Sequence, residues 1–221
     1  MKPDMRPWTP DIDLPDHERI AHAAAFCERM ATRHSCRSFS DDPVPRAIIE
    51  TAIAAAGSAP SGANRQPWHF AALSSLGAKT ALRVAVEEEE RSFYGGIGGS
   101  EWQGLLRPLG TTADKPYLEI APWIIVAFGQ TKANETDRFP NPHVVESVSL
   151  ACGTLLATLH LAGLATLVHT ATPARFLNRL CRRPEIERPI MLIVTGHPAA
   201  DATVPAAALE RKPLDQIASW L

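Results

Sequence analysis

Cysteine is scarce in this chain, and its few copies lie far apart. The 221 residues contain four cysteines, with no CxxC pair and no histidine at metal-ligand spacing. They are Cys27, Cys36, Cys152 and Cys181. Disulfide-stapled domains need denser cysteine, and zinc sites need paired ligands at short spacing. The sequence therefore argues against a disulfide scaffold, and we expect no metal site.

An excess of charge of either sign is also lacking. The formal net charge is -2, and neither sign is gathered into a tail. A nucleic-acid partner is therefore not expected, because such binding needs concentrated Lys and Arg. The N-terminal stretch MKPDMRPWTPDIDLPDHE has prolines and acids where a signal peptide has an apolar core. We expect a cytoplasmic protein.

One segment alone is apolar enough to be mistaken for a membrane span. Residues 147–168, SVSLACGTLLATLHLAGLATLV, contain no Asp, Glu, Lys or Arg and have about the length that a bilayer requires. His160, several Ser and Thr, and Leu-Ala-Gly at 161–163 favour instead a buried helix that runs into a strand. We therefore expect no membrane partner. A helix so uniformly apolar suits an intersubunit core, which predicts an obligate homodimer.

Apolar periodicity divides the chain into short helices and strands. The composition, 45% hydrophobic and 21% charged, is that of a soluble globular protein. We predict an extended N-terminal arm over residues 1–16 and one α+β domain over 17–221, with residues 95–112 irregular. Helices are predicted over 17–34, 48–56, 77–94 and 174–183 and from about 143, and strands over 68–73, 123–128, 165–169 and 190–195.

Three separate stretches carry candidate chemistry. Residues 33–37, RHSCR, place two guanidinium groups and a hydroxyl where they could grip a phosphate; the alternative is a basic helix end favoured by the macrodipole. Residues 60–68, PSGANRQPW, would let a flat ligand approach the backbone, or form an ordinary connecting loop. Residues 211–217, RKPLDQI, are the third candidate stretch, and the alternative is a solvated tail.

Taken in order, these stretches resemble the FMN-dependent nitroreductase superfamily, and more closely its iodotyrosine deiodinase branch. The resemblance runs from about Arg33 to Ile217, which is most of the chain. It also includes the acidic run that ends in Tyr94, KPYL at 115–118 before Ala121 and Pro122, and SLACG at 149–153. It implies a nitroreductase-like mixed sheet flanked by helices, in an intertwined homodimer.

The resemblance implies FMN as cofactor and assigns residues to it. Thr172 matches the hydroxyl that the family places near flavin N5 and is the expected catalytic residue. His34 stands where the family often has a second Arg, and Ala171 departs from the Thr-rich run of animal relatives. The residues expected to bind FMN are Arg33, His34, Ser35, Arg37 and Arg211, with Thr170, Ala171 and Thr172, and from the partner subunit Pro60, Ser61 and Gly62.

Cys36 lies between the expected phosphate ligands. Positive charge there would lower the pKa of its thiol. We favour the alternative that Cys36 only packs.

The stretch EEEERSFY, residues 87–94, supplies the expected substrate site. Glu90 and Tyr94 are four apart on a predicted helix and so share a face, and Lys115 arrives from a separate extended segment. In the resembling family the matching residues clasp the ammonium and carboxylate of a tyrosine-like zwitterion, and the backbone N–H at Ala63 orients the phenolate. Glu87 to Glu89 are expected on a solvated face, within a lid of about residues 87–118.

The resemblance implies FMN-dependent reductive dehalogenation of halogenated tyrosine, which releases halide and tyrosine. NADPH is the expected ultimate electron donor, with a separate flavin-reducing partner as an alternative to direct reduction. Three alternatives remain open: a general FMN nitroreductase or quinone reductase, the flavin-destroying branch that makes the lower ligand of cobalamin, and a flavin-binding protein without turnover. None of these needs a zwitterion clasp.

Overall fold

The computed structural model describes residues 3–7, 13–97, 100–134, 136–170 and 174–221. The chain forms two compact units, residues 1–33 and 34–221. The first unit holds helix α1, Asp16–Ala31, which follows the non-helical residues 13–15; the arm over residues 1–16 stays a prediction. Acids in its first turn and Arg29 in its last turn suit the helix macrodipole. The helix ends at Ala31, before the predicted end at residue 34. The second compact unit begins at residue 34.

A four-stranded sheet is the centre of the second unit. Its strands are β1 (Trp68–Leu73), β2 (Trp123–Gln130), β3 (Ala165–His169) and β4 (Glu187–Gly196), in the order β1-β2-β4-β3. All four predicted strands are confirmed, and the α+β fold with them. Neighbouring strands pair antiparallel, and a parallel bridge joins Ser35 to Thr166 of β3.

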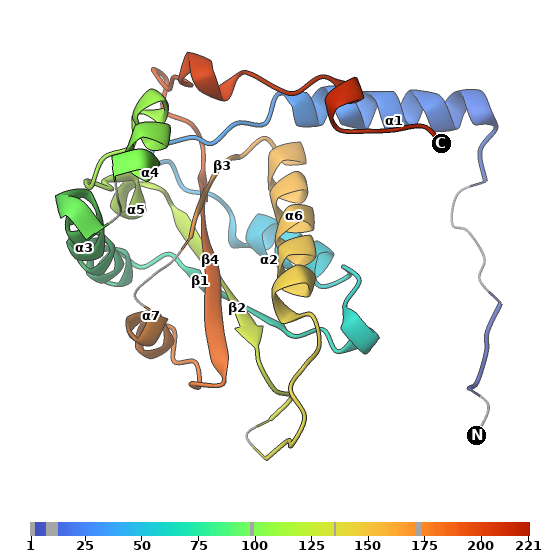
Figure 1. Cartoon of the computed structure of the whole chain (residues 1–221), viewed down its shortest axis with the longest axis horizontal. Helices are drawn as coiled ribbons and strands as arrows, with labels where there is room; N and C mark the ends of the chain where they lie inside the picture. Colours follow the sequence, from blue (N-terminus) through green and yellow to red (C-terminus); the bar gives the residue numbers. More distant parts are fainter. Residues whose placement is uncertain (1–2, 8–12, 98–99, 135, 171–173) are drawn as a thin grey trace. The chain divides into compact units, whose positions relative to one another are not determined.

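The two faces of the sheet support two separate cores, because successive strand residues point to opposite sides. One face packs against α3 (Leu76–Ser92), α5 (Tyr117–Ile120) and α7 (Ala174–Leu180) through Ile124, Val126 and Phe128. The other packs against α2 (Arg46–Ala56) and α6 (Val144–Leu161) through Ile125 and Ala127. Figure 1 shows these helices on the two sides of the sheet.

Helix α6 carries most of the charge-free run. By length and composition alone it could cross a membrane. It instead covers the sheet and is followed directly by β3, as the predicted buried helix running into a strand requires. The residues it buries are Ser147, Val148, Ala151, Cys152, Leu155 and Leu159.

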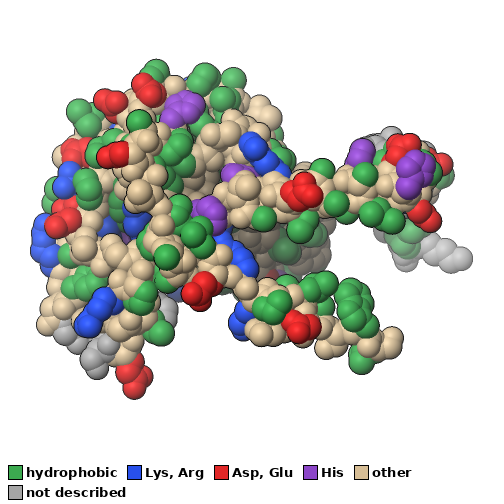
Figure 2. Space-filling view, turned by 90° about the horizontal axis from the view of Figure 1, so that it is seen from above, with side chains coloured by type: hydrophobic (Ala, Val, Ile, Leu, Met, Phe, Trp, Pro, Cys, Tyr) green, Lys and Arg blue, Asp and Glu red, His purple; other side chains and the backbone are tan. Residues whose placement is uncertain are grey.

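The surface of the protein mixes charged and apolar side chains. On the face seen in Figure 2, acidic, basic and apolar side chains are interspersed. Helix α6 also exposes large apolar residues: Val145 is 56%, Leu150 53% and Leu161 52% exposed. Such side chains on one helix are candidates for contact with another protein surface.

The prediction that residues 95–112 are irregular is wrong. A π-helical turn, Phe93–Ile97, continues α3, and α4 (Ser100–Leu106) and a 3-10 turn (Arg107–Leu109) follow. Gly110 then ends the helical segment in the left-handed conformation that favours glycine, with φ +64°. The glycines suggested a loop, whereas in the structure this segment forms one wall of a cavity.

Candidate functional site

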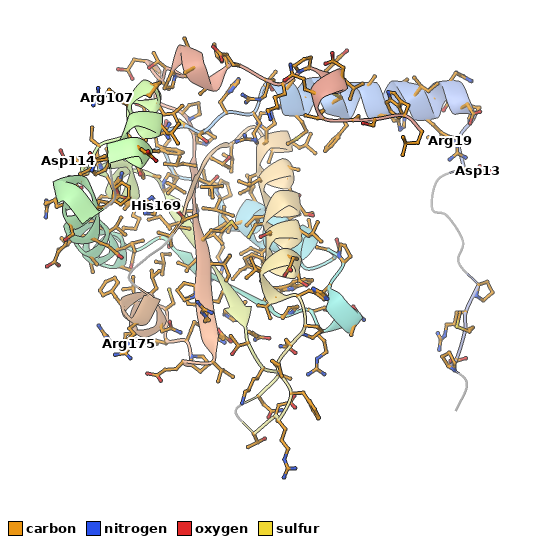
Figure 3. All side chains as sticks on the ribbon, in the orientation of Figure 1. Asp13, Arg19, Arg107, Asp114, His169 and Arg175 are labelled. Atoms are coloured by element: carbon orange, nitrogen blue, oxygen red, sulfur yellow. The ribbon has the colours of Figure 1, made fainter. Side chains whose placement is uncertain are left out.

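A cavity of about 560 Å³ lies beside the end of β3, between the C-terminal part of α3 and the segment that precedes α5. This volume falls in the range of sites for small molecules and cofactors. Figure 3 shows His169, the last residue of β3, on the side of the sheet where α3 and α5 lie. Residues that line the cavity include Arg37, Glu90, Tyr94, Lys115, Tyr117, His169 and Thr170.

The three predicted substrate residues Glu90, Tyr94 and Lys115 come together in this cavity. The Lys115 ammonium is 3.2 Å from a carboxylate oxygen of Glu90 and 5.8 Å from the centre of the Tyr94 ring. Lys115 is only 5% exposed, and the Tyr94 hydroxyl donates to Thr111 Oγ1 at 2.9 Å. An anion and a cation are thus held side by side next to an aromatic ring in a place largely shielded from water.

Glu87 is buried, so its predicted place on a solvated face is wrong. Its carboxylate accepts hydrogen bonds from the Lys115 backbone N–H at 2.7 Å and from Arg83 Nε at 2.8 Å. Burial raises the pKa of Glu87, but the hydrogen bonds from Arg83 and Lys115, with the charges of Arg83 and Arg91, outweigh it and leave the pKa below its ordinary value. Glu87 therefore fixes the backbone that presents Lys115.

The other two residues of the predicted solvated face differ from each other. Glu88 is exposed, as predicted, whereas Glu89 lines the cavity and has a buried Oε2 atom with no hydrogen-bond partner among the described residues. The lid over residues 87–118 stays a prediction. Its first residue, Glu87, and Lys115, Tyr117 and Leu118 near its end are buried, so any movement would have to involve the residues between them.

His169 is a functional candidate that the sequence did not reveal. Its Nε2 atom is buried, lacks a hydrogen-bond partner among the described residues, and lies 3.7 Å from Glu90 Oε1. Burial and the positive charge of Lys115 lower the pKa of His169 to about 4. The nearby Glu90 does not reverse this, because its charge is already compensated by Lys115 at 3.2 Å. The imidazole is therefore neutral at pH 7, and its approach to Glu90 is not an ion pair.

The lowered pKa of His169 predicts a loss of stability in mild acid. The unfolded chain takes up this proton near its ordinary pKa of 6.5, and the folded chain only near about 4. Between these values the unfolded state binds more protons, so the free energy of unfolding falls as pH falls. Between about pH 6.5 and 5 the free energy of unfolding of the unaltered protein should fall by about 2 kcal/mol more than that of the His169→Gln variant, which lacks the titrating group. Urea denaturation across this range measures it, and equal pH slopes in the two proteins would contradict it.

Of the residues predicted to bind FMN, Arg37 and Thr170 line the cavity. Ser35 lies beside it through its bridge to Thr166, whose neighbour Leu167 is in the cavity wall. His34 Nδ1 and Thr166 Oγ1 are buried without hydrogen-bond partners among the described residues. A guanidinium group and a hydroxyl group in the wall of a cavity of this size fit a phosphorylated cofactor such as FMN.

The thiol of Cys36 behaves as a packing group. Burial raises its pKa, which the hydrogen bond to the Ser38 carbonyl and the charge of Arg37 lower only in part. The lowering that the neighbouring positive charges suggested is therefore not found, and the favoured alternative of packing is confirmed by its place in the core.

The remaining predicted cofactor residues are not brought to the cavity within the described part of the second unit. Arg211 is exposed and donates to the backbone carbonyls of Ala208 and Glu210. Ala171 and Thr172 lie outside the described residues, and Arg33 belongs to the first unit. Their roles stay predictions.

The loop with Pro60, Ser61, Gly62 and Ala63 lies against the start of α6 rather than at the cavity. The Gly62 N–H donates to Ser147 Oγ at 3.3 Å, and a Cβ at Gly62 would meet the Pro142 carbonyl at 3.0 Å. A side chain at this position would therefore need the neighbouring backbone to shift by a few tenths of an ångström. Ala63, with φ 51°, adopts the left-handed conformation, which orients its backbone N–H. Their predicted contact with the flavin of a partner subunit stays a prediction.

Comparison with known proteins agrees with this geometry. The nitroreductase family model matches residues 30–197. The iodotyrosine deiodinase of Haliscomenobacter hydrossis is 42% identical and the match covers 88% of each chain. Iodotyrosine deiodinase 1 of Homo sapiens is 39% identical, over 92% of this chain and 71% of that protein.

Solved structures show the same fold. A crystal structure of oxidised iodotyrosine deiodinase bound to FMN and 3-iodo-L-tyrosine matches 86% of this chain and 96% of that chain, with a TM-score of 0.74 and 26% identity. A nitroreductase family protein of Streptococcus pneumoniae matches with a TM-score of 0.64 over 89% of this chain and all of that chain, at 19% identity. The second likeness concerns the fold alone.

Proposed function

Because the chain belongs to the nitroreductase family, we propose that it is an FMN-dependent oxidoreductase that removes halide from halogenated tyrosine. The observation that carries this proposal is the pair of the buried Lys115 and the partly buried Glu90 beside the Tyr94 ring. A free amino acid presents an ammonium and a carboxylate on one carbon, so its recognition needs an anion and a cation close together. Relatives at about 40% identity that are named iodotyrosine deiodinase support the same substrate class.

The reaction replaces an aryl carbon–halogen bond by a carbon–hydrogen bond, consumes two electrons and one proton, and releases halide. FMN, when bound, supplies the two electrons. Arg37, Ser35 and Thr170 would hold it, since they lie in or beside the cavity wall. We propose NADPH as the ultimate electron source.

The chain's own residues would bind and orient the substrate. Lys115 would pair with the substrate carboxylate and Glu90 with its ammonium, so that each side chain exchanges its present partner for one of opposite charge on the ligand. Because Lys115 is buried and its backbone is fixed by Glu87, little ordering cost remains at binding. Neutral His169 would leave the negative charge of Glu90 intact.

The proposal is tested with FMN-loaded protein reduced by dithionite and mixed with 3-iodotyrosine without oxygen. We expect iodide and tyrosine in equal amounts, one of each for every two electrons. Nitroaromatic and quinone substrates serve as comparison. Reduction of these with no release of iodide would overturn the proposal in favour of a general nitroreductase.

We propose in addition that the protein is a homodimer. The apolar residues that α6 exposes, Val145, Leu150 and Leu161, would be covered by a second copy, and the loop at Ser61 would then reach the partner's cofactor. Sedimentation velocity over a dilution series tests this. A stable monomer that retains FMN would contradict it.

A further inference from the structure

A second concave surface is lined mainly by arginine. It has a volume of about 420 Å³ and lies between α7, the turn after it and the start of β4. Four of its arginines are exposed, and we refer to these as the arginine surface. They are Arg175, Arg179, Arg182 and Arg188.

These four guanidinium groups have no carboxylate partner within 4.0 Å among the residues that the structure describes. The fifth arginine of the hollow, Arg183, differs: it makes two 2.6 Å bonds to the buried carboxylate of Glu187. Arg175 and Arg179 are four apart and share one face of α7, and Figure 3 shows Arg175 pointing outward from that helix. Of the two glutamates that line the hollow, Glu187 is paired with Arg183 and Glu185 is exposed, so five arginines face two carboxylates and positive charge is in excess here.

The framework beneath the arginine surface is rigid. Asn178, which is 9% exposed, donates hydrogen bonds from Nδ2 to the carbonyls of Pro184 at 2.8 Å and Glu187 at 2.7 Å. With the pair of Arg183 and Glu187, these bonds tie α7 to the start of β4. Like charges held close together on such a framework repel one another, so they do not stabilise the fold and are suited to meeting an anion.

The arginine surface lies next to the candidate active site. Helix α7 begins at Ala174, four positions after the cavity residue Thr170. Its Leu177 is fully buried in the same core cluster as Leu167 and Tyr117, which line the cavity. A single helix, about 10 Å across, therefore separates the outer arginines from the core beneath the cavity.

We propose that the arginine surface docks an acidic one-electron carrier protein of the ferredoxin class, which reduces the flavin. This inference rests on the proposed function, which consumes two electrons. Two reduced carriers would each lose one electron. With one proton from solvent, the aryl carbon–iodine bond becomes a carbon–hydrogen bond and iodide leaves.

The test uses FMN-loaded protein and a plant-type [2Fe–2S] ferredoxin as probe. Binding is measured by calorimetry and flavin reduction by anaerobic stopped flow, each at about 20 mM and about 200 mM salt. The test variant is Arg175→Glu with Arg179→Glu. The matched control is Arg46→Glu with Arg138→Glu, two exposed arginines outside the hollow. Arg46 lies at the N-terminus of α2, where Glu suits the helix dipole, and the pair that it loses with Glu50 is exposed and contributes little.

We expect the higher salt to weaken ferredoxin binding about tenfold, and the test variant to lower affinity and reduction rate at least about tenfold at low salt. The control should stay within about twofold, and Arg175→Gln with Arg179→Gln should give an intermediate loss. Equal losses in test and control variants, absence of salt dependence, or no binding to the unaltered protein would overturn the proposal.

Dithionite separates the two proposals, because it reduces the flavin without docking. Normal iodide release with dithionite but no effect of the arginine variants on ferredoxin would overturn the docking surface alone. No iodide release with dithionite would overturn the proposed function. Competition for ferredoxin binding by NADPH, with the same arginines required, would assign the surface to a nucleotide instead.

Discussion

Replacing Lys115 by alanine is expected to weaken binding of 3-iodotyrosine about 100-fold while FMN stays bound. The change removes the cation that faces the substrate carboxylate. It also leaves Glu90, now 3.2 Å from the Lys115 ammonium, without its positive partner. Truncating one member of a buried charge pair at a binding site typically costs about 2–5 kcal/mol. A titration of the oxidised protein, followed by flavin absorbance and fluorescence, measures the dissociation constant.

Two further variants serve as a second test and as a control. Glu90→Gln should weaken 3-iodotyrosine binding in the same direction, because it removes the charge that faces the substrate ammonium. Lys132→Ala, a lysine that does not line the cavity, should leave the dissociation constant unchanged. If Lys115→Ala retains both FMN and unaltered 3-iodotyrosine binding, the zwitterion clasp is wrong.

Glu87→Ala is expected to lower the free energy of unfolding by about 3 kcal/mol, the cost typical of breaking a buried ion pair by removing one partner. The lost carboxylate accepts from Arg83, Arg91 and the Lys115 N–H. Because the pKa of Glu87 lies below its ordinary value, its contribution is present above the carboxyl pKa of the unfolded chain and is lost as pH falls through the folded pKa. Urea denaturation at neutral pH measures the difference.

Glu88→Ala is the matched control, since Glu88 is the exposed neighbour on the same helix. It should change stability by no more than about 0.5 kcal/mol. Glu87→Ala should also weaken 3-iodotyrosine binding, because the backbone that carries Lys115 loses its anchor. Equal stability of the two variants would show that Glu87 is not a structural carboxylate.

The sequence predicted the elements that local patterns determine. Strand β1 was predicted with its observed limits, Trp68–Leu73, because the small and polar residues before it and the helix start after it mark both ends. Residues 95–112 were misread, because glycine marks both loops and helix ends and only the packing distinguishes them. The sequence also could not show that Gly62 lies against Pro142, which is far along the chain.

In the site, too, the residues set by local spacing could be predicted and those set by tertiary packing could not. Glu90, Tyr94 and Lys115 could be predicted as a set, through helical spacing and a family resemblance. Glu87 could not be separated from its neighbours, because its partner is the backbone N–H of Lys115, 28 positions away. His169 carried no signal either: its lowered pKa arises from burial and from Lys115, both of which depend on the tertiary fold.

The loop before β1 has an energetic consequence of its own. Ala63, Asn64 and Gln66 have φ values of 51°, 52° and 48°, and left-handed backbone costs a residue other than glycine about 1–2 kcal/mol. Several kcal/mol of conformational strain are thus stored in a few residues and must be offset by the contacts of this loop with the start of α6. Local opening here would release that strain, so whatever packs on the loop in an assembly also holds it closed.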